Sequence, residues 1–159
     1  MEKPLISGIA FTKDEAKVTL IKVPNIPGVA YKILGPIEKG NIDVDMIVQN
    51  VGLDGTTDFT FLLPRSDLAN ALSIIEKEVT PQTGKLDIHT STSVAKVSVV
   101  GVGMRTHANV ASTAFEALAK EGINILMIGT SEIKLSIVLE DKYMELAVRA
   151  LHEAFGLDK

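Results

Sequence analysis

The residues best suited to bind a small molecule form the run Asn25-Ile26-Pro27-Gly28, between an expected strand and an expected helix. The first backbone N–H groups of a helix have no partner inside it, and the helix dipole adds positive potential there. Such a helix end suits a carboxylate, and Gly28 would allow the ligand's close approach. The simpler interpretation of the same residues is a tight Pro-Gly turn without a ligand.

Polar residues at strand ends are a second set of candidates. Gln49 and Asn50 follow an apolar segment, and Thr130 and Ser131 take the equivalent place later in the chain. Amide and hydroxyl groups there could bind the polar atoms of a ligand. They could equally bridge to the neighbouring hairpin or to water. The residues alone leave both interpretations open.

Motifs for catalysis or metal binding are weak. Gly101-Val102-Gly103 begins like a dinucleotide-binding loop, but Thr106 stands in place of the third glycine. His89, His107 and His152 lack metal-ligand spacing. We therefore expect a binding module without cofactor or metal.

Composition narrows the partners and the compartment. The 159 residues carry a net charge of -4 with no basic run, which argues against a nucleic-acid partner. Cysteine is absent, which excludes disulfides and thiolate chemistry and fits a reducing, cytoplasmic setting. No signal peptide and no apolar run of membrane-spanning length are evident, so no membrane association is expected.

The two halves of the chain repeat one another. Ala16-Lys17-Val18 is matched by Ala95-Lys96-Val97, and the segment 42–47 is matched by 123–128, displaced by 81 positions. A repeat of about 80 residues has the size of a small domain. Two similar domains usually pack on each other or on a second copy of the chain. The interface between them is then a place where a ligand can bind.

Hydrophobic periodicity predicts the order βαββαβ for the first half. Its expected elements are a strand at 17–23, a helix from Val29 ended by Gly40-Asn41, strands at 44–51 and 59–63 around the turn Leu53-Asp54-Gly55, a helix capped by Ser66 or Asp67 and stopped by Pro81 and Gly84, and a strand at 85–90.

The second half predicts βαββα and lacks the closing strand. Its strands are expected at 97–102, 125–128 and 135–139, and its helices from Val110 and Met144. The alternating residues Leu5, Ser7, Ile9 and Phe11 are not needed by the first half, so we expect them to supply the missing strand. The expected fold is α+β, with two tandem ferredoxin-like βαββαβ domains: 14–92, and 93–159 plus the N-terminal strand 3–13.

Several motifs together resemble the regulatory region of bacterial aspartate kinase. They are Ile42-Asp43-Val44-Asp45-Met46-Ile47-Val48-Gln49-Asn50, the hairpin 54–58, the run 95–104, Thr130-Ser131-Glu132-Ile133 and the ending 150–155. In that family the region forms two ACT domains, either at the C-terminus of the large subunit or as a separate small subunit. The resemblance covers nearly the whole chain, while the family's Lys-Phe-Gly-Gly-Thr kinase signature is absent.

The resemblance implies a non-catalytic regulatory role. An end-product amino acid, threonine or alternatively lysine, would bind at ACT–ACT interfaces and cause feedback inhibition of the first step of the aspartate-family pathway. The implied partners are a second copy, in a homodimer through the ACT domains, and the catalytic subunit or kinase domain.

The resemblance also implies the effector-binding residues. These are Asn25, Ile26, Pro27, Gly28, Ala30 and Gln49 from the first half, with Asn124, Ile125 and Ser131 from the second. Loop amides would take the carboxylate, Gln49 and Asn124 the polar atoms, and Ile125 the aliphatic part.

Two departures from the family pattern bear on the effector. Family members commonly carry aspartate where this chain has Asn25, and a charge-assisted bond is about twice as strong as a neutral one, so the affinity would be lower. The lysine-responsive His-Pro-Gly run is here His107-Ala108-Asn109, which favours threonine.

Two alternatives stay open. One is an ACT-domain sensor or regulatory subunit of another amino-acid biosynthetic enzyme. The other is a small ferredoxin-like enzyme such as an acylphosphatase, for which Arg105 and Asn109 are the nearest catalytic candidates. The sequence also leaves open whether the chain is a natural small subunit or an excised region.

Overall fold

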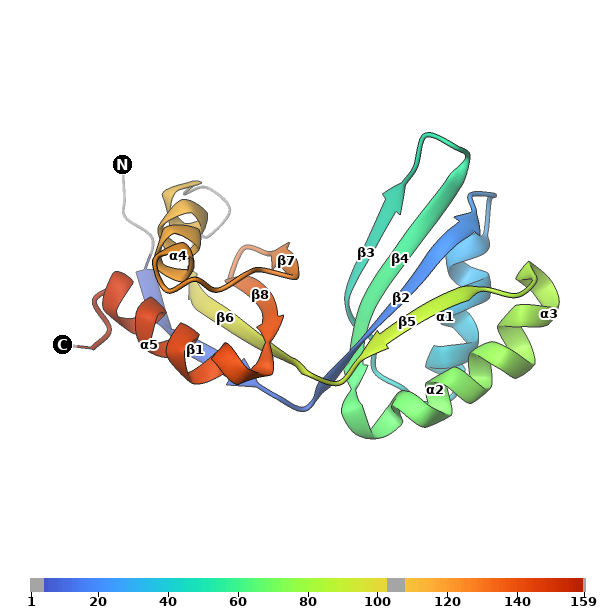
Figure 1. The fold of residues 1–159 in the computed structure, drawn as a ribbon, viewed down its shortest axis with the longest axis horizontal. Coiled ribbons are helices and arrows are strands. Elements are labelled where there is room, and N and C mark those ends of the chain that lie inside the picture. Colours follow the sequence, from blue (N-terminus) through green and yellow to red (C-terminus); the bar gives the residue numbers. More distant parts are fainter. Residues whose placement is uncertain (1–4, 103–107, 159) are drawn as a thin grey trace. The chain divides into compact units, whose positions relative to one another are not determined.

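The computed structural model describes residues 5–102 and 108–158 of the chain. Contacts between Cα atoms divide it into two compact units, described separately here: the first unit, Asp14–Thr92, and the second unit, Met1–Lys13 with Ser93–Lys159. Figure 1 labels their elements, which are β1 (Leu5–Thr12), β2 (Glu15–Pro24), α1 (Val29–Lys39), β3 (Asp45–Val51), β4 (Thr56–Pro64), α2 (Leu68–Ile74), α3 (Thr80–Thr83), β5 (Asp87–Ser91), β6 (Val94–Val102), α4 (Ala108–Lys120), β7 (Met127–Thr130), β8 (Lys134–Glu140) and α5 (Met144–Ala154).

The first unit is an antiparallel four-stranded sheet in the order β3-β4-β2-β5, with helices covering one face (Figure 1). Alternation on β2 and β4 sends Val18, Leu20 and Phe59 toward the helices, where they are buried. The helix α1 meets them with Val29, Ile33 and Ile37, spaced one turn apart. This is the predicted βαββαβ arrangement.

The second helical segment of the first unit differs from the sequence-based expectation in two ways. No side-chain hydrogen bond from Ser66 or Asp67 caps it; instead the 3₁₀ turn Arg65–Asp67 leads into α2. Pro81 does not stop it either. A π-helical turn, Ile75–Val79, passes into α3, where Pro81 lies in the first turn and needs no N–H partner. The segment ends at Gly84, which has a φ of 82°.

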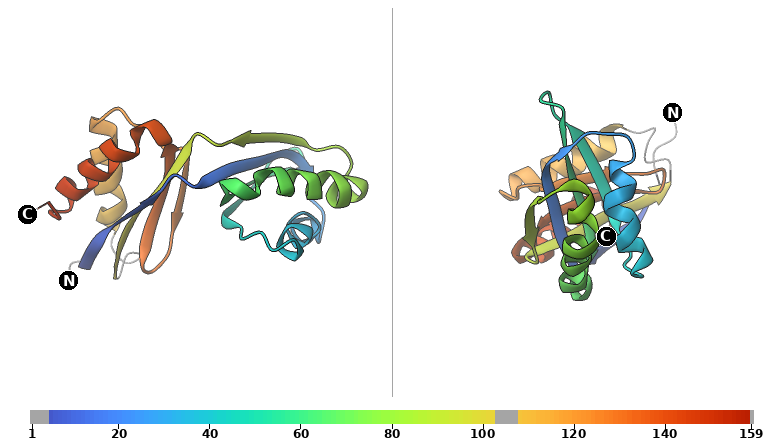
Figure 2. Two further views of the ribbon diagram at one scale, coloured as in Figure 1. Left: turned by 90° about the horizontal axis from the view of Figure 1, so that it is seen from below. Right: turned by 90° about the vertical axis from the view of Figure 1, so that its right-hand side faces the viewer.

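The second unit has the same sheet order, β1-β6-β8-β7, and its first strand comes from the N-terminus. β1 pairs antiparallel with β6, from Leu5 opposite Val102 to Thr12 opposite Lys96. Ile6 and Ile9 pack against the core that α4 and α5 form with β6 and β8. The prediction that the N-terminal strand completes this unit is confirmed, and Figure 2 shows β1 beside β6 from two further directions. Among the described residues, no helix is long and apolar enough to cross a membrane.

Candidate functional site

The loop Asn25–Gly28 joins the end of β2 to the start of α1, as the sequence predicts. Gly28 is the residue before the helix and has a φ of 86°, a conformation that glycine adopts without the cost a Cβ would bring. No side chain caps α1, and the N–H of Val29 bonds to the carbonyl of Ile26. Within the described residues, the N–H groups of Ala30 and Tyr31 meet no acceptor. The helix therefore begins with donors that a bound anion can use.

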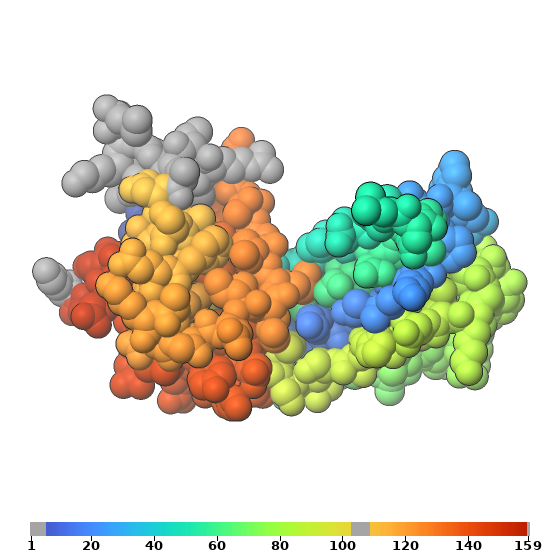
Figure 3. All heavy atoms as spheres, turned by 45° about the horizontal axis from the view of Figure 1, so that its top comes forward, coloured from blue at the N-terminus to red at the C-terminus, as the bar shows by residue number. Residues whose placement is uncertain are grey.

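The loop is exposed and tied to the β3–β4 hairpin. Asn25 donates its backbone N–H to the carbonyl of Gly55 over 3.1 Å. Inside the hairpin turn, Asp54 accepts hydrogen bonds from the hydroxyl and the N–H of Thr56, at 2.6 and 3.1 Å. The Thr56 hydroxyl is the main reason that the pKa of Asp54 lies below its usual value. Figure 3 shows the loop at the surface of its unit, in blue near the teal hairpin.

Gln49 and Asn50 lie within β3, the edge strand, and point to opposite faces of the sheet. Gln49 pairs with Phe59, a core residue, so its side chain is on the face that α1 covers. Asn50 pairs with Asp58 on the other face. Both side chains are exposed, and neither forms a hydrogen bond within the described ranges that would tie it to the hairpin. Of this pair, only Gln49 shares a face with α1.

In the second unit, the candidate residues flank β7. Asn124 is exposed in the connection from α4, whereas Ile125 is partly buried against the core of its own unit. The Ser131 hydroxyl accepts hydrogen bonds from the N–H groups of Ile133 and Lys134, at 3.3 and 3.2 Å. Ser131 thus stabilises the β7–β8 turn. Serine often hydrogen-bonds to nearby backbone N–H groups in turns, so its place between two expected strands could have suggested this role.

Comparisons with related sequences and solved structures show the family to which this chain belongs. An ACT-domain profile matches residues 97–155. The aspartokinase of Pseudomonas aeruginosa is 63% identical over 99% of this chain, which spans 38% of that relative. A solved structure of aspartokinase alpha and beta subunits contains a chain 50% identical to this one, with 99% of that chain covered and 95% of this one, at a TM-score of 0.87. This chain belongs to the aspartate kinase family.

Its place within aspartate kinases is the regulatory part. The regulatory subunit of aspartate kinase from Thermus thermophilus, solved in ligand-free form, is 35% identical, with a TM-score of 0.89 over 95% of this chain and 99% of that one. The two sheets with their helices are therefore tandem ACT domains. The chain spans well under half of the full-length kinases it matches, as the 38% coverage shows.

Within this aspartate kinase chain, the candidate residues fall into two groups. The loop Asn25–Gly28, Ala30 and Gln49 belong to the first unit, where the loop and Ala30 lie at the start of α1 and Gln49 lies on the helix-covered face of β3. Asn124, Ile125 and Ser131 belong to the second unit. Arg105, Thr106 and His107 of the matching second loop lie outside the described residues. Over the described ranges, no group of three potential metal ligands occurs.

Sequence reasoning missed the residue that directs β2 into the loop. Lys22 has a φ of 56° at a β-bulge, and its N–H donates to Asp58 Oδ1 over 2.8 Å. Left-handed backbone at a lysine is unfavourable, so the carboxylate of Asp58 stabilises a bend that the chain would otherwise resist. The only signal was Asp58, the one charged residue of the returning strand 56–64.

Proposed function

We propose that this chain is the amino-acid-sensing regulatory part of an aspartate kinase and that threonine is its effector. The observation that carries the proposal is the exposed, uncapped start of α1 with Gln49 on the same side of the sheet. The chain itself performs no catalysis in this proposal. We expect it to act in the cytoplasm and to have no cofactor.

The ligand contacts follow from the chemistry of the loop. The effector's carboxylate binds the N–H groups of Ala30 and Tyr31 at the positive end of α1. The exposed amide of Gln49 then meets the hydroxyl or ammonium of threonine. Asn25 brings no charge to the ammonium, so the affinity is lower than an aspartate would give.

A second ACT domain completes the site in this proposal. Asn124 offers an exposed amide and Ile125 the apolar contact for the effector's methyl group. These residues reach the ligand across an ACT–ACT interface of a homodimer. Ser131 acts indirectly, because its hydroxyl is engaged in its own turn.

Regulation requires that threonine binds one arrangement of the domains better than another. A coupling free energy of about 1–3 kcal/mol between effector and catalytic sites is enough for strong feedback inhibition. The catalytic subunit, or a kinase domain on the same polypeptide, is the partner that carries the activity. The solved pairing of aspartokinase alpha and beta subunits supports such an arrangement.

Calorimetry on this chain tests the proposal. We expect heat from threonine binding, with a weaker response or none from lysine, and none from methionine or isoleucine. Absence of heat with all four amino acids would overturn the sensing function. Sedimentation of the free and the threonine-bound chain would show whether the binding species is a dimer.

The variant Gln49→Ala tests the position of the ligand. Loss of one hydrogen bond costs about 1 kcal/mol, which weakens threonine binding roughly fivefold. Asn50→Ala is the matched control, since it removes the neighbouring exposed amide from the opposite face of β3. Equal affinities of the two variants would show that Gln49 does not contact the effector.

A further inference from the structure

The end of β2 carries one residue more than the strand beside it. Between Leu20 and Val23, the register of β2 against β4 shifts by one residue. Two residues of β2 there, Ile21 and Lys22, lie opposite the single residue Asp58 of β4. Such a β-bulge bends its strand and leaves the extra residue outside the ladder of backbone hydrogen bonds. The N–H of Lys22 donates instead to Asp58 Oδ1 over 2.8 Å, so the residue opposite the bulge also supplies its acceptor.

The bulge decides which residues at the end of β2 face the core. Side chains alternate along a strand, so Leu20 and Val23 could not share a face in a regular one. Both are fully buried in the same core cluster. Without the extra residue, Lys22 would take the core position and Val23 would face outward. The bulge thus keeps the charged side chain exposed and the apolar one buried.

The same register shift sets the position of the binding loop against the β3–β4 hairpin. Beyond the bulge, Pro24 lies opposite Thr56, and the N–H of Asn25 then reaches the carbonyl of Gly55. A displacement by one residue would break this bond and move the start of α1 relative to β3. The relative position of the uncapped α1 amides and the Gln49 side chain therefore depends on the bulge.

Within the described residues, the second unit has neither the bulge nor the carboxylate at the equivalent place. There β6 pairs with β8 in one continuous register up to Val100, opposite Lys134. The next residue, Gly101, matches Lys22 in the sequence repeat, and Lys134 takes the place of Asp58. Bulge and carboxylate therefore occur together in the unit that carries the candidate loop.

The carboxylate of Asp58 acts from the side of the sheet away from the candidate site. Asp58 lies between Thr57 and Phe59, whose side chains are buried on the core face, so alternation places its own side chain on the opposite face. A ligand at the start of α1 is out of its reach. Its contact is the backbone of Lys22, whose φ of 56° is unfavourable for a residue with a Cβ. A charged acceptor forms a stronger hydrogen bond than a neutral one and offsets that cost.

We propose that Asp58 is a positioning residue of the effector site: its carboxylate holds the bulge at Lys22 and thereby fixes the loop Asn25–Gly28 for binding. The inference rests on the proposed threonine site, and it adds a residue that controls the affinity without touching the ligand. The apparent affinity for a ligand falls in proportion to the fraction of molecules in the binding-competent form. Loss of the carboxylate lowers that fraction, because the left-handed conformation of Lys22 is then unsupported.

Calorimetry with threonine on the variant Asp58→Ala tests the proposal. We expect the affinity to fall about tenfold, which corresponds to a bulged form in about a tenth of the molecules. Asp58→Asn keeps an uncharged oxygen acceptor and should lose less affinity. Asp87→Ala is the charge control, because Asp87 is an exposed carboxylate opposite Ile21 on the neighbouring strand β5, and it should bind like the unchanged chain. Equal losses in Asp58→Ala and Asp87→Ala would assign the effect to charge and overturn the proposal.

A substitution at Lys22 separates positioning of the loop from a general loss of stability. Glycine adopts a positive φ without the cost that a Cβ brings, so the bulge no longer needs the carboxylate. In a chain that carries Lys22→Gly, Asp58→Ala should therefore reduce threonine affinity by less than about twofold. If Asp58 only stabilised the fold, the loss would be the same with lysine or glycine at this position, and that result would overturn the proposal.

Hydrogen exchange of the Asn25 amide distinguishes this proposal from the sensing function. Asp58→Ala should speed the exchange, and the addition of Lys22→Gly should slow it again, with or without threonine. If threonine binds the unchanged chain but Asp58→Ala alters neither affinity nor exchange, positioning is overturned while sensing stands. If the unchanged chain binds no threonine, sensing fails. The exchange of the Asn25 amide then decides by itself whether Asp58 positions the loop, and equal exchange in all variants would show that it does not.

Discussion

The backbone N–H of Asn25 donates a hydrogen bond to the carbonyl oxygen of Gly55 over 3.1 Å, although thirty positions separate the two residues. This bond joins the candidate binding loop to the tip of the β3–β4 hairpin. The start of α1 is therefore positioned by two elements, the end of β2 and the hairpin. Changes in the hairpin are expected to reach the loop amides through this contact.

Gly28→Ala should weaken threonine binding more than it weakens folding. A Cβ at this glycine would meet no atom within 4 Å, so the cost comes from its φ of 86°, at about 1 kcal/mol. Relief of that strain would turn the amides of Ala30 and Tyr31 away from the ligand. Gly122→Ala is the matched control, with a φ of 70° and equal open space in the second unit. Calorimetry and urea unfolding compare the two; a similar loss of threonine affinity in both would contradict the role of Gly28.

Thr56→Val should raise the pKa of Asp54 toward its ordinary value of 3.8, because the hydroxyl of Thr56 is the largest cause of the depression. A carboxyl whose pKa is depressed on folding contributes stability above its unfolded pKa, and the contribution is lost as pH falls through the folded pKa. The stability difference between the two proteins should therefore shrink below pH 3.8. NMR titration of the Asp54 carboxyl measures the shift, and an unchanged pKa would show that the hydroxyl is not responsible.

Removal of residues 1–12 should destabilise the second unit first. β6 would lose one of its two neighbouring strands, and the core would lose Ile6 and Ile9, which together cost at least about 3 kcal/mol. Amide hydrogen exchange should accelerate in β6 and β8 before β2 and β4.

Two single substitutions in β1 test the same contact on a smaller scale. Ile9→Ala should destabilise the second unit, because Ile9 packs against its core. Phe11→Ala should have little effect, because the Phe11 side chain is 55% exposed. Equal exchange in both units after the deletion would argue against the completing role of β1.

The stability effects of substitutions at Ser98 and Ser136 should be coupled in a double-mutant cycle. Their hydroxyl groups lie 2.8 Å apart and are buried in the sheet of the second unit. Ser98→Ala leaves the Ser136 hydroxyl buried without a partner, at a cost of about 1–2 kcal/mol. The double change to alanine removes both polar groups and should cost no more than one single change. Urea unfolding measures the cycle, and strictly additive costs would indicate that the bond contributes nothing.

Local patterns were sufficient for much of the fold and part of the site. The repeated segments and the spacing of Val29, Ile33 and Ile37 predicted the elements and their order. The Pro-Gly run predicted the loop before α1. Pro81 was misleading because proline is tolerated in the first turn of a helix, and whether a new helical turn begins there depends on the packing of Ile75 and Val79.

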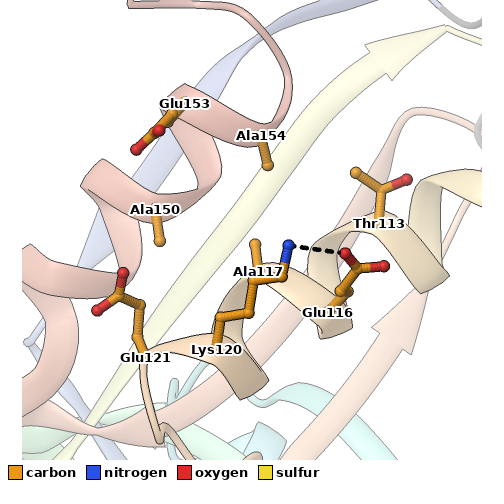
Figure 4. A pocket seen from close by; sticks show the side chains of 8 residues that line it. All are labelled: Thr113, Glu116, Ala117, Lys120, Glu121, Ala150, Glu153 and Ala154. Atoms are coloured by element: carbon orange, nitrogen blue, oxygen red, sulfur yellow. Dashed lines mark ion pairs between the residues drawn. The ribbon is translucent and has the colours of Figure 1, made fainter.

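The sequence by itself determined the duplicated βαββαβ pattern and the N-terminal strand left over from the first half. Only the tertiary structure decided that Gln49 faces the helices while Asn50 does not, because strand register with Phe59 sets the face. It also decided that Ala117 of α4 and Ala150 of α5 line one hollow (Figure 4), since a hollow depends on which side chains two helices bring together. Hydrophobic periodicity shows which side of a single helix or strand is buried, so it can be predicted from a short stretch of sequence. Strand register and the packing between helices depend on contacts between residues far apart in the chain.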